Sequence, residues 1–135
     1  MTEPLFEYPF TLRLHDTDAA GVIYFARLLD RAHEAYEAFL ESAGLPLNNW
    51  LGQGPQLPLV HAEADFLAPI RLGRQVRVKL WATEVGRTSF TLDYAFTGEG
   101  GEKLARARTV HVAMQQGECV TLPDGLRAVL QNPGQ

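Results

Sequence analysis

The chain has 135 residues, of which 46% are apolar and 21% charged, so one globular domain with a substantial core is expected. A net charge of −4 argues against nucleic-acid binding through bulk positive charge, and the single cysteine, Cys119, excludes an intrachain disulfide. No signal peptide and no apolar run of the ~18 residues needed for a membrane span are visible. We therefore expect a cytoplasmic protein without nucleic-acid or membrane partners.

The first half of the chain changes from a period of two to a helical period. Residues 6–14 alternate strictly, which predicts a half-buried strand whose apolar face carries Phe6, Tyr8, Phe10, Leu12 and Leu14. Residues 24–43 repeat apolar positions at spacings of three and four, which predicts a helix of about five turns. Gly44 and Pro46 are typical of the residues that follow a helix end.

The second half predicts four strands joined mostly by short turns. Residues 48–58 form a loop in which Trp50 and Leu51 either cover an apolar pocket or simply anchor the loop. Strands are expected at 59–67, 75–84, 89–97 and 104–115, with a hairpin turn at Gly86 and Arg87 and one helical turn at 126–130. One face of the last strand carries Arg106 and Arg108 beside Leu104, Val110, Val112 and Met114. The pattern predicts one α+β domain over residues 1–135, with an antiparallel five-stranded sheet around one long helix, and apolar strand faces that favour oligomerisation.

Residues 16–25, DTDAAGVIYF, lie where the first strand gives way to the helix. A carboxylate near the free N–H groups of a helix start suits acyl chemistry, because the carboxylate attacks or activates water while the N–H groups hold the oxyanion. Aspartates also occur in turns and helix caps for structural reasons alone, so the segment by itself leaves both interpretations open. The sequence has no Gly-x-Ser-x-Gly elbow.

These ten residues resemble the signature of the 4-hydroxybenzoyl-CoA thioesterase family, which has the hotdog fold. Its pattern is Asp-x-Asp-x-x-Gly, then two Val or Ile positions, then Tyr or Trp, then Phe or His. The resemblance continues over nearly the whole chain. Residues 32–37 (AHEAYE) and 57–62 (LPLVHA) are most similar to the branch of the family that hydrolyses 1,4-dihydroxy-2-naphthoyl-CoA in phylloquinone biosynthesis.

The resemblance implies a role for each matching residue. Asp18 takes the place of the catalytic carboxylate, as nucleophile or as general base, and the backbone N–H of Phe25 takes the place of the oxyanion donor. Gly21 lets the turn bring the thioester close to the helix start, and Asp16 is a turn or cap residue. The reaction calls for no metal and no cofactor. The family also implies a homo-oligomer, which we expect to be a tetramer built from dimers, with CoA lying between subunits.

The remaining candidates are binding residues. We expect Tyr24, His33 and His61 to contact substrate, and Arg87, Thr88 and Ser89 to hold a CoA phosphate at the hairpin turn. Arg71, Arg74, Arg106 and Arg108 are further phosphate candidates, and each is otherwise a solvated surface charge. His111 is expected to pack or to lie in an interface. Three alternatives stay open: another aromatic acyl-CoA substrate, a short-chain acyl-CoA substrate, and a non-catalytic acyl-CoA-binding module.

Overall fold

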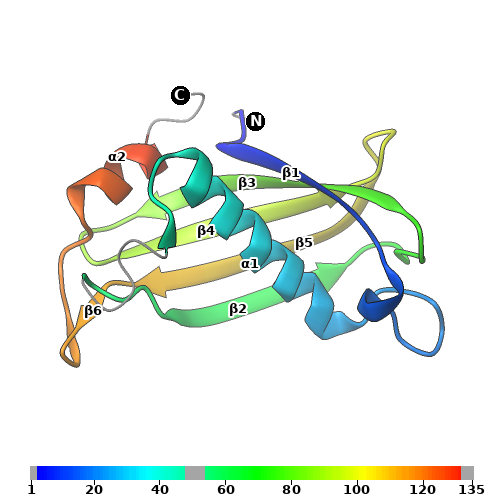
Figure 1. Ribbon diagram of the computed structural model, residues 1–135, viewed down its shortest axis with the longest axis horizontal. Coiled ribbons are helices and arrows are strands. Elements are labelled where there is room, and N and C mark those ends of the chain that lie inside the picture. The colour runs from blue at the N-terminus through cyan, green and yellow to red at the C-terminus, as the bar shows by residue number, and fades with distance from the viewer. Residues whose placement is uncertain (1–2, 48–53, 132–135) are drawn as a thin grey trace.

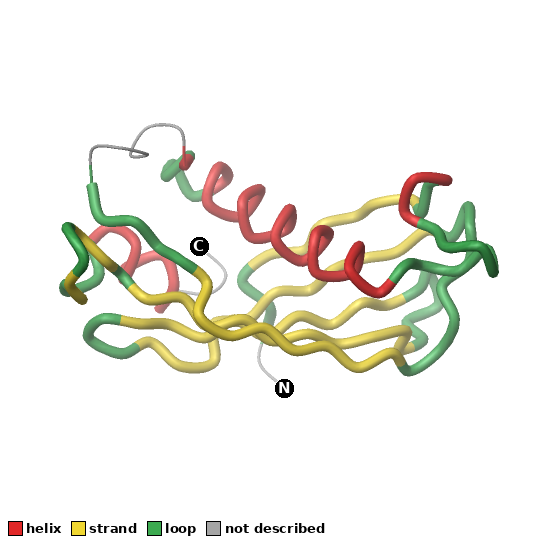
Figure 2. The backbone as a smooth tube through the Cα atoms, turned by 90° about the horizontal axis from the view of Figure 1, so that it is seen from below, coloured by secondary structure: helices red, strands yellow, loops and turns green. Residues whose placement is uncertain are grey.

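One long helix crosses one face of a five-stranded sheet (Figures 1 and 2). The computed structural model describes residues 3–47 and 54–131. The strands of this sheet are β1 (Phe6–Thr11), β2 (Leu59–Phe66), β3 (Gln75–Val85), β4 (Ser89–Thr97) and β5 (Lys103–Val112). The long helix is α1 (Phe25–Ser42), and a short helix, α2 (Asp124–Gln131), lies near its C-terminal end in Figure 1. The predicted α+β arrangement is confirmed.

The sheet has the strand order β1-β3-β4-β5-β2, and every neighbouring pair is antiparallel. The two strands nearest the N-terminus, β1 and β2, are therefore the two edges. Among the described residues, both helices lie on the same side of the sheet in Figure 2, which leaves the other face without a helix. The motif follows the last residue of β1, Thr11, which pairs with the first residue of β3, Gln75. The motif therefore lies at the end of the sheet where β1 ends and β3 begins.

The helix is fixed by its apolar stripe and by a specific end. Its buried residues recur at helical spacing and pack into the core: Leu28, Ala32, Ala35, Tyr36, Phe39 and Leu40. Gly44 has φ +81°, and its N–H donates to Glu41 O while the N–H of Leu45 donates to Leu40 O. This pair of hydrogen bonds is the Schellman motif, so Gly44 ends the helix as the sequence predicted.

Strand β5 turns its small and polar residues, not its larger apolar ones, toward the helix. Ala105, Ala107, Thr109 and His111 are buried, and they alternate with the exposed Arg106 and Arg108. Hydropathy alone did not indicate this face, because alanine and threonine carry little apolar signal. Their size leaves room for the large side chains of α1 and β4.

Several element boundaries differ from the sequence predictions. The strand predicted to reach Leu14 ends at Thr11, because the chain bends into a 3-10 helix at Leu14–Asp16, and Leu14 is 75% exposed. The strand predicted to end at residue 115 stops at Val112, and a two-stranded hairpin follows, β6 (Met114–Gln115) with β7 (Glu118–Cys119). The predicted helical turn at 126–130 is the longer α2.

The loop predicted at 48–58 is described only from residue 54 onward, where Gln56 pairs with Met114. The alternatives for Trp50 and Leu51 lie outside the described residues. Within the described ranges, no helix is long and apolar enough to cross a membrane.

Candidate active site

The motif folds into a tight loop between the 3-10 helix and α1. Its base is closed by the bridge between Thr17 and Ile23. Inside it, the N–H of Asp18 donates to Val22 O at 2.9 Å, and the N–H of Gly21 donates to Asp18 O at 3.0 Å. Gly21 has φ +79°, a conformation that side chains with a Cβ seldom adopt, so the turn requires glycine here.

The same turn orients the carboxylate of Asp18. Its Oδ1 accepts the N–H of Ala20 at 2.8 Å, which is the Asx-turn geometry typical of aspartate. Its other oxygen accepts no hydrogen bond, and no cation pairs with it, among the described residues. The residue is exposed. An anion that is oriented but not neutralised is available to attack a carbonyl carbon or to take a proton from water.

Asp18 and the start of α1 line one cleft. This cleft has a volume of about 520 Å³, and apart from Asp18 its walls are apolar: Val22, Ile23, Tyr24, Phe25, Phe66, Leu67, Ala68, Pro69 and Ile70. Leu67 and its neighbours come from the end of β2 and the segment that follows it. The cleft therefore suits a ligand with a large apolar body and one reactive polar group.

The helix start supplies a donor at this cleft. Helix α1 begins at Phe25, without a side-chain cap from Tyr24 and without an acidic residue in its first turn. No group in the described part of the chain accepts the N–H of Phe25. A free N–H at the positive end of a helix favours a negative charge close to it. The arrangement can stabilise the oxyanion that forms when a thioester carbonyl is attacked.

A family model of the thioesterase-like superfamily matches residues 12–130. The chain belongs to this family. The 1,4-dihydroxy-2-naphthoyl-CoA hydrolase of Synechocystis is 42% identical over 132 residues, which is 96% of this chain and 91% of the relative.

Two solved structures extend the likeness to the fold. The crystal structure of a 1,4-dihydroxy-2-naphthoyl-CoA thioesterase from Synechocystis has a TM-score of 0.87 at 39% identity, over 93% of this chain and 94% of that one. A gentisyl-coenzyme A thioesterase has a TM-score of 0.84 at 25% identity, over 92% and 98%. The family and the hotdog fold predicted from the motif are confirmed.

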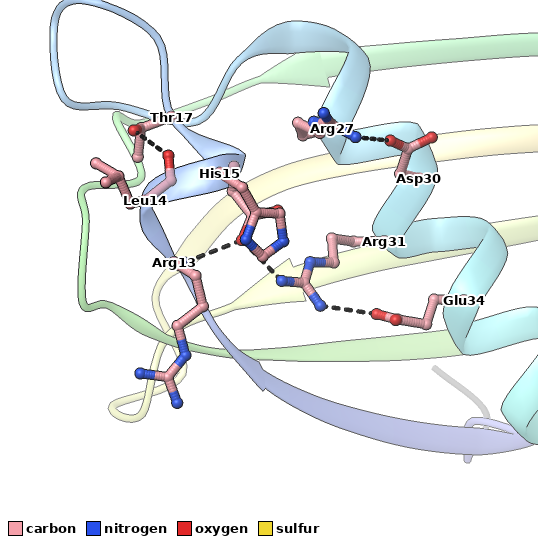
Figure 3. Close-up of polar contacts among 9 residues, drawn as sticks. Arg13, Leu14, His15, Thr17, Arg27, Asp30, Arg31 and Glu34 are labelled. Atoms are coloured by element: carbon pink, nitrogen blue, oxygen red, sulfur yellow. Dashed lines mark hydrogen bonds and ion pairs between the residues drawn. The ribbon is translucent and has the colours of Figure 1, made fainter.

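In this thioesterase-like chain, the two motif aspartates lie in opposite environments, since Asp16 is buried and Asp18 is exposed. Figure 3 shows Arg13 and Arg31, two of the residues around Asp16. Asp16 is only 2% exposed, and its carboxylate accepts hydrogen bonds from Arg31 at 2.7 Å and from the N–H of Arg13 at 2.9 Å. Burial raises the pKa of Asp16, but these hydrogen bonds and the Arg31 charge outweigh it and hold the pKa below its usual range. Asp16 is therefore bound within the protein, whereas Asp18 faces the cleft.

The structure brings some predicted binding residues to the cleft and leaves others away from it. Tyr24 lines it. His33 lies farther along α1, where its ring stacks on that of His111 with centroids 6.2 Å apart. His61 is exposed on β2, with its Nε2 2.8 Å from Glu63 Oε1.

The hairpin residues Arg87, Thr88 and Ser89 lie at the far end of the sheet from the motif. The first residue of β3, Gln75, pairs with Thr11 just before the motif, and β3 then runs eleven residues to Val85. At about 3.3 Å per residue, the strand separates the two sites by roughly 33 Å. Within one chain, this hairpin and Asp18 do not share a site.

The other candidate arginines differ in how they are paired. Arg74, Arg106 and Arg108 form ion pairs with Glu102, Asp65 and Asp93, at 3.2, 2.9 and 2.7 Å respectively. Arg71 is exposed, and its side chain has no ion pair or hydrogen bond among the described residues. Its backbone forms a bridge with Val22 of the motif, directly after Ile70 of the cleft wall. Of these four arginines, Arg71 is the one located to meet an anionic part of a ligand.

A second hollow lies on the face of the sheet that no helix covers. It has a volume of about 480 Å³, and its charged lining residues are Glu63, Asp65, Asp93, Arg106 and Arg108. The charges are largely paired with one another, and Arg108 holds Asp93 through two hydrogen bonds of 2.7 and 3.2 Å. No group of three or more metal-ligating side chains occurs in the part of the chain that the structure describes.

Sequence reasoning missed a buried polar chain beneath the middle of α1. Tyr94 Oη lies 2.9 Å from Thr109 Oγ1, which lies 3.0 Å from His111 Nε2. His111 is fully buried, so the prediction that it packs is confirmed, and burial lowers its pKa to about 4. Only its alternation with Arg108 and Val110 could have indicated an inward position.

Proposed function

We propose that this protein is an acyl-CoA thioesterase that hydrolyses 1,4-dihydroxy-2-naphthoyl-CoA to 1,4-dihydroxy-2-naphthoate and CoA, as in phylloquinone biosynthesis. The observation that carries the reaction class is the location of the Asp18 carboxylate and the Phe25 helix start on one apolar cleft. The acyl group is supported by the relatives of that name, at 42% identity in sequence and 39% among solved structures.

The chemistry requires only groups that the cleft contains. The thioester oxygen accepts the N–H of Phe25, and Asp18 either attacks the carbonyl carbon or removes a proton from an attacking water. On the first route, the carbon–sulfur bond breaks to give an acyl-aspartyl anhydride and CoA thiolate, and water then hydrolyses the anhydride. On the second route, water oxygen bonds to the carbon directly, and the thiolate leaves as the tetrahedral intermediate collapses.

A panel of acyl-CoA esters tests the substrate. Free-thiol release would be measured with 1,4-dihydroxy-2-naphthoyl-CoA, gentisyl-CoA, 4-hydroxybenzoyl-CoA and a short-chain aliphatic acyl-CoA. We expect the highest kcat/KM with the naphthoyl ester. A preference for gentisyl-CoA or for the aliphatic ester would replace the acyl group but keep the reaction class. No hydrolysis of any ester would favour the non-catalytic binding module.

Label found in Asp18 after a single-turnover reaction in oxygen-18 water would identify the nucleophilic route. If Asp18 is the nucleophile, water opens the anhydride at either carbonyl. Hydrolysis at the aspartyl carbonyl leaves label in Asp18, which mass spectrometry of its peptide detects. If Asp18 is the base, label enters only the released acid.

The sheet edge supports the proposed homo-oligomer. Strand β2 is an edge strand with exposed side chains on both faces, including Val60 at 59% and Phe66 at 46%. An open apolar edge is a template for pairing with another chain. Because Phe66 also lines the cleft, a copy paired along β2 would cover one cleft wall.

We propose a tetramer built from such dimers, in which Arg87, Thr88 and Ser89 of another subunit reach the CoA phosphates. Light scattering of the purified protein gives the mass directly, and a monomer would contradict this assembly. The cytoplasmic location expected from the sequence stays a prediction.

A further inference from the structure

The buried ion pair between Asp16 and Arg31 joins the motif loop to the second turn of α1. Arg31 Nη2 lies 2.7 Å from Asp16 Oδ2, and the two side chains are 14% and 2% exposed. The guanidinium is held from two further sides, because Nη1 donates to Glu34 at 2.8 Å and the group lies 4.6 Å above the ring of Phe10. Figure 3 shows Arg31 projecting from the helix toward the loop. A guanidinium fixed in this way has little freedom to follow the loop if the loop moves.

Asp16 in turn holds both ends of the loop. Its carboxylate accepts the N–H of Arg13 on the incoming side, and its backbone oxygen accepts the N–H of Tyr24 at 2.8 Å on the outgoing side. Tyr24 immediately precedes the first residue of α1. One residue therefore connects the strand exit, the helix start and the helix body.

Asp18 lies two residues beyond this junction, and the contacts described for it are to backbone groups of the loop itself, at Ala20, Gly21 and Val22. The loop thus fixes the carboxylate relative to itself, and Asp16 fixes the loop relative to the helix start. Resting on the proposed function, we infer that Arg31 is a positioning residue for hydrolysis, because its ion pair with Asp16 sets the Asp18 carboxylate relative to the Phe25 N–H. A buried pair of this kind is poor evidence for stability and is better suited to fixing one geometry.

The helix provides a matched control. Arg27 pairs with Asp30 at 2.9 Å on the same helix, but both side chains are exposed, at 46% and 62%. Replacing Arg27 removes the same side chain without touching the loop. Glu34→Gln removes the other partner of Arg31 and leaves Asp16 in place, which separates the two contacts of the guanidinium.

The test compares Arg31→Gln, Asp16→Asn, the double variant and Arg27→Gln in the full-length protein, with the ester that the wild-type protein hydrolyses best. We expect Arg31→Gln to lower kcat about 10- to 100-fold with KM nearly unchanged, because misplacement by about 1 Å is enough for such losses. The double variant should be no worse than the poorer single variant, since the pair acts as a unit. Arg27→Gln should stay within about twofold of wild type, as expected for an exposed pair. Glu34→Gln should lose less kcat than Arg31→Gln, because the contact of Arg31 with Asp16 remains.

Hydrogen exchange supplies a readout independent of activity. In Arg31→Gln, the amides of Asp18 and Gly21 should exchange faster while those of the sheet stay protected. Unchanged kcat and unchanged exchange in a folded Arg31→Gln protein would overturn the inference. So would kcat losses that multiply in the double variant. If Arg31→Gln fails to fold, Asp16→Asn removes the carboxylate charge of the pair from the other side, and a wild-type kcat in a folded Asp16→Asn protein would likewise reject the proposal. A wild-type protein without hydrolase activity would instead reject the proposed function. The exchange experiment would still test whether the Asp16–Arg31 ion pair holds the loop against α1.

Discussion

The cleft at the start of α1 and the hollow on the uncovered sheet face are similar in size, but their charges are arranged in opposite ways. The hollow on the uncovered sheet face, of about 480 Å³, holds several carboxylates and arginines that are largely paired with one another. The cleft at the start of α1, of about 520 Å³, holds one carboxylate, Asp18, with no cationic partner in the described chain. A high density of charge is therefore not a sign of reactivity, because paired charges satisfy each other.

The largest expected effect comes from removing the unpaired carboxylate. Asp18→Asn keeps the shape of the side chain and loses the anion, so kcat for the preferred ester should fall about 100-fold or more with KM little changed. Asp93→Asn makes the same change in the outer hollow and should leave kcat within about twofold. Steady-state kinetics of the two variants test the comparison directly. Near-normal turnover by Asp18→Asn would remove the catalytic assignment.

Acid is expected to lower the stability of the folded protein through a buried core residue, His111, which lies away from the cleft. The pKa of His111 is about 4 in the folded protein and about 6.5 when unfolded, so below pH 6.5 the unfolded chain binds a proton that the folded one does not. This contribution to stability is complete above pH 6.5 and is lost as the pH falls toward 4, by about 3 kcal/mol.

Denaturant unfolding at pH 7, 5.5 and 4.5 measures that loss, and His111→Gln should flatten it. Equal pH dependence in the two proteins would mean that other groups drive acid unfolding. Loss of hydrolysis at a pH where the protein remains folded would then report on groups in the cleft.

Glycine substitutions test whether kcat depends on the geometry of the motif turn as well as on the charge of Asp18. Gly21 and Gly101 have φ of +79° and +86°, and neither has an atom within 4 Å of an added Cβ. An alanine at either position should cost about 1 kcal/mol through backbone strain alone. Only Gly21→Ala should also lower kcat, by about tenfold, because it displaces Asp18. Equal activity in the two variants, measured beside their thermal unfolding, would show that the turn tolerates the change.

The smallest effect is expected from the unpaired arginine beside the cleft. Arg71→Ala should raise KM for an acyl-CoA about fivefold, whereas Arg106→Ala, which removes a paired arginine, should not. The corresponding acyl-pantetheine, which lacks the phosphates, identifies the anion. If Arg71→Ala raises KM for this ester too, the arginine recognises the acyl or pantetheine part. No change with either ester would remove Arg71 from the site.

Periodicity identified the elements with the strongest patterns. Helix α1 and strands β3 and β4 lie within two residues of their predicted limits, because their apolar residues keep one period over nine or more positions. The family resemblance identified Asp18 and Phe25 as candidates, and the fold brings both to one cleft.

Features that depend on distant parts of the chain could not be predicted in this way. Asp16 and Arg31 are fifteen residues apart on different elements, so only the folded structure shows that they meet. The inward face of β5 is carried by small and polar residues, which hydropathy does not distinguish from an exposed face. The distance between Arg87 and the motif within one chain follows from the length of β3. Whether Arg87 of another subunit lies near the motif depends on how the subunits assemble.

The hydrogen bonds around the motif also constrain the order in which the protein can fold during synthesis. Leu12 exchanges backbone hydrogen bonds with Gly73 and Arg74, and Ile23 donates to Ile70. These partners are made some fifty to sixty residues after the motif. A ribosome-bound chain can form α1 early, since the backbone hydrogen bonds of a helix are local, but it cannot close the motif loop until more than half of the polypeptide has emerged. The nascent protein therefore carries the Asp18 carboxylate for a long time before that carboxylate is held beside the start of α1.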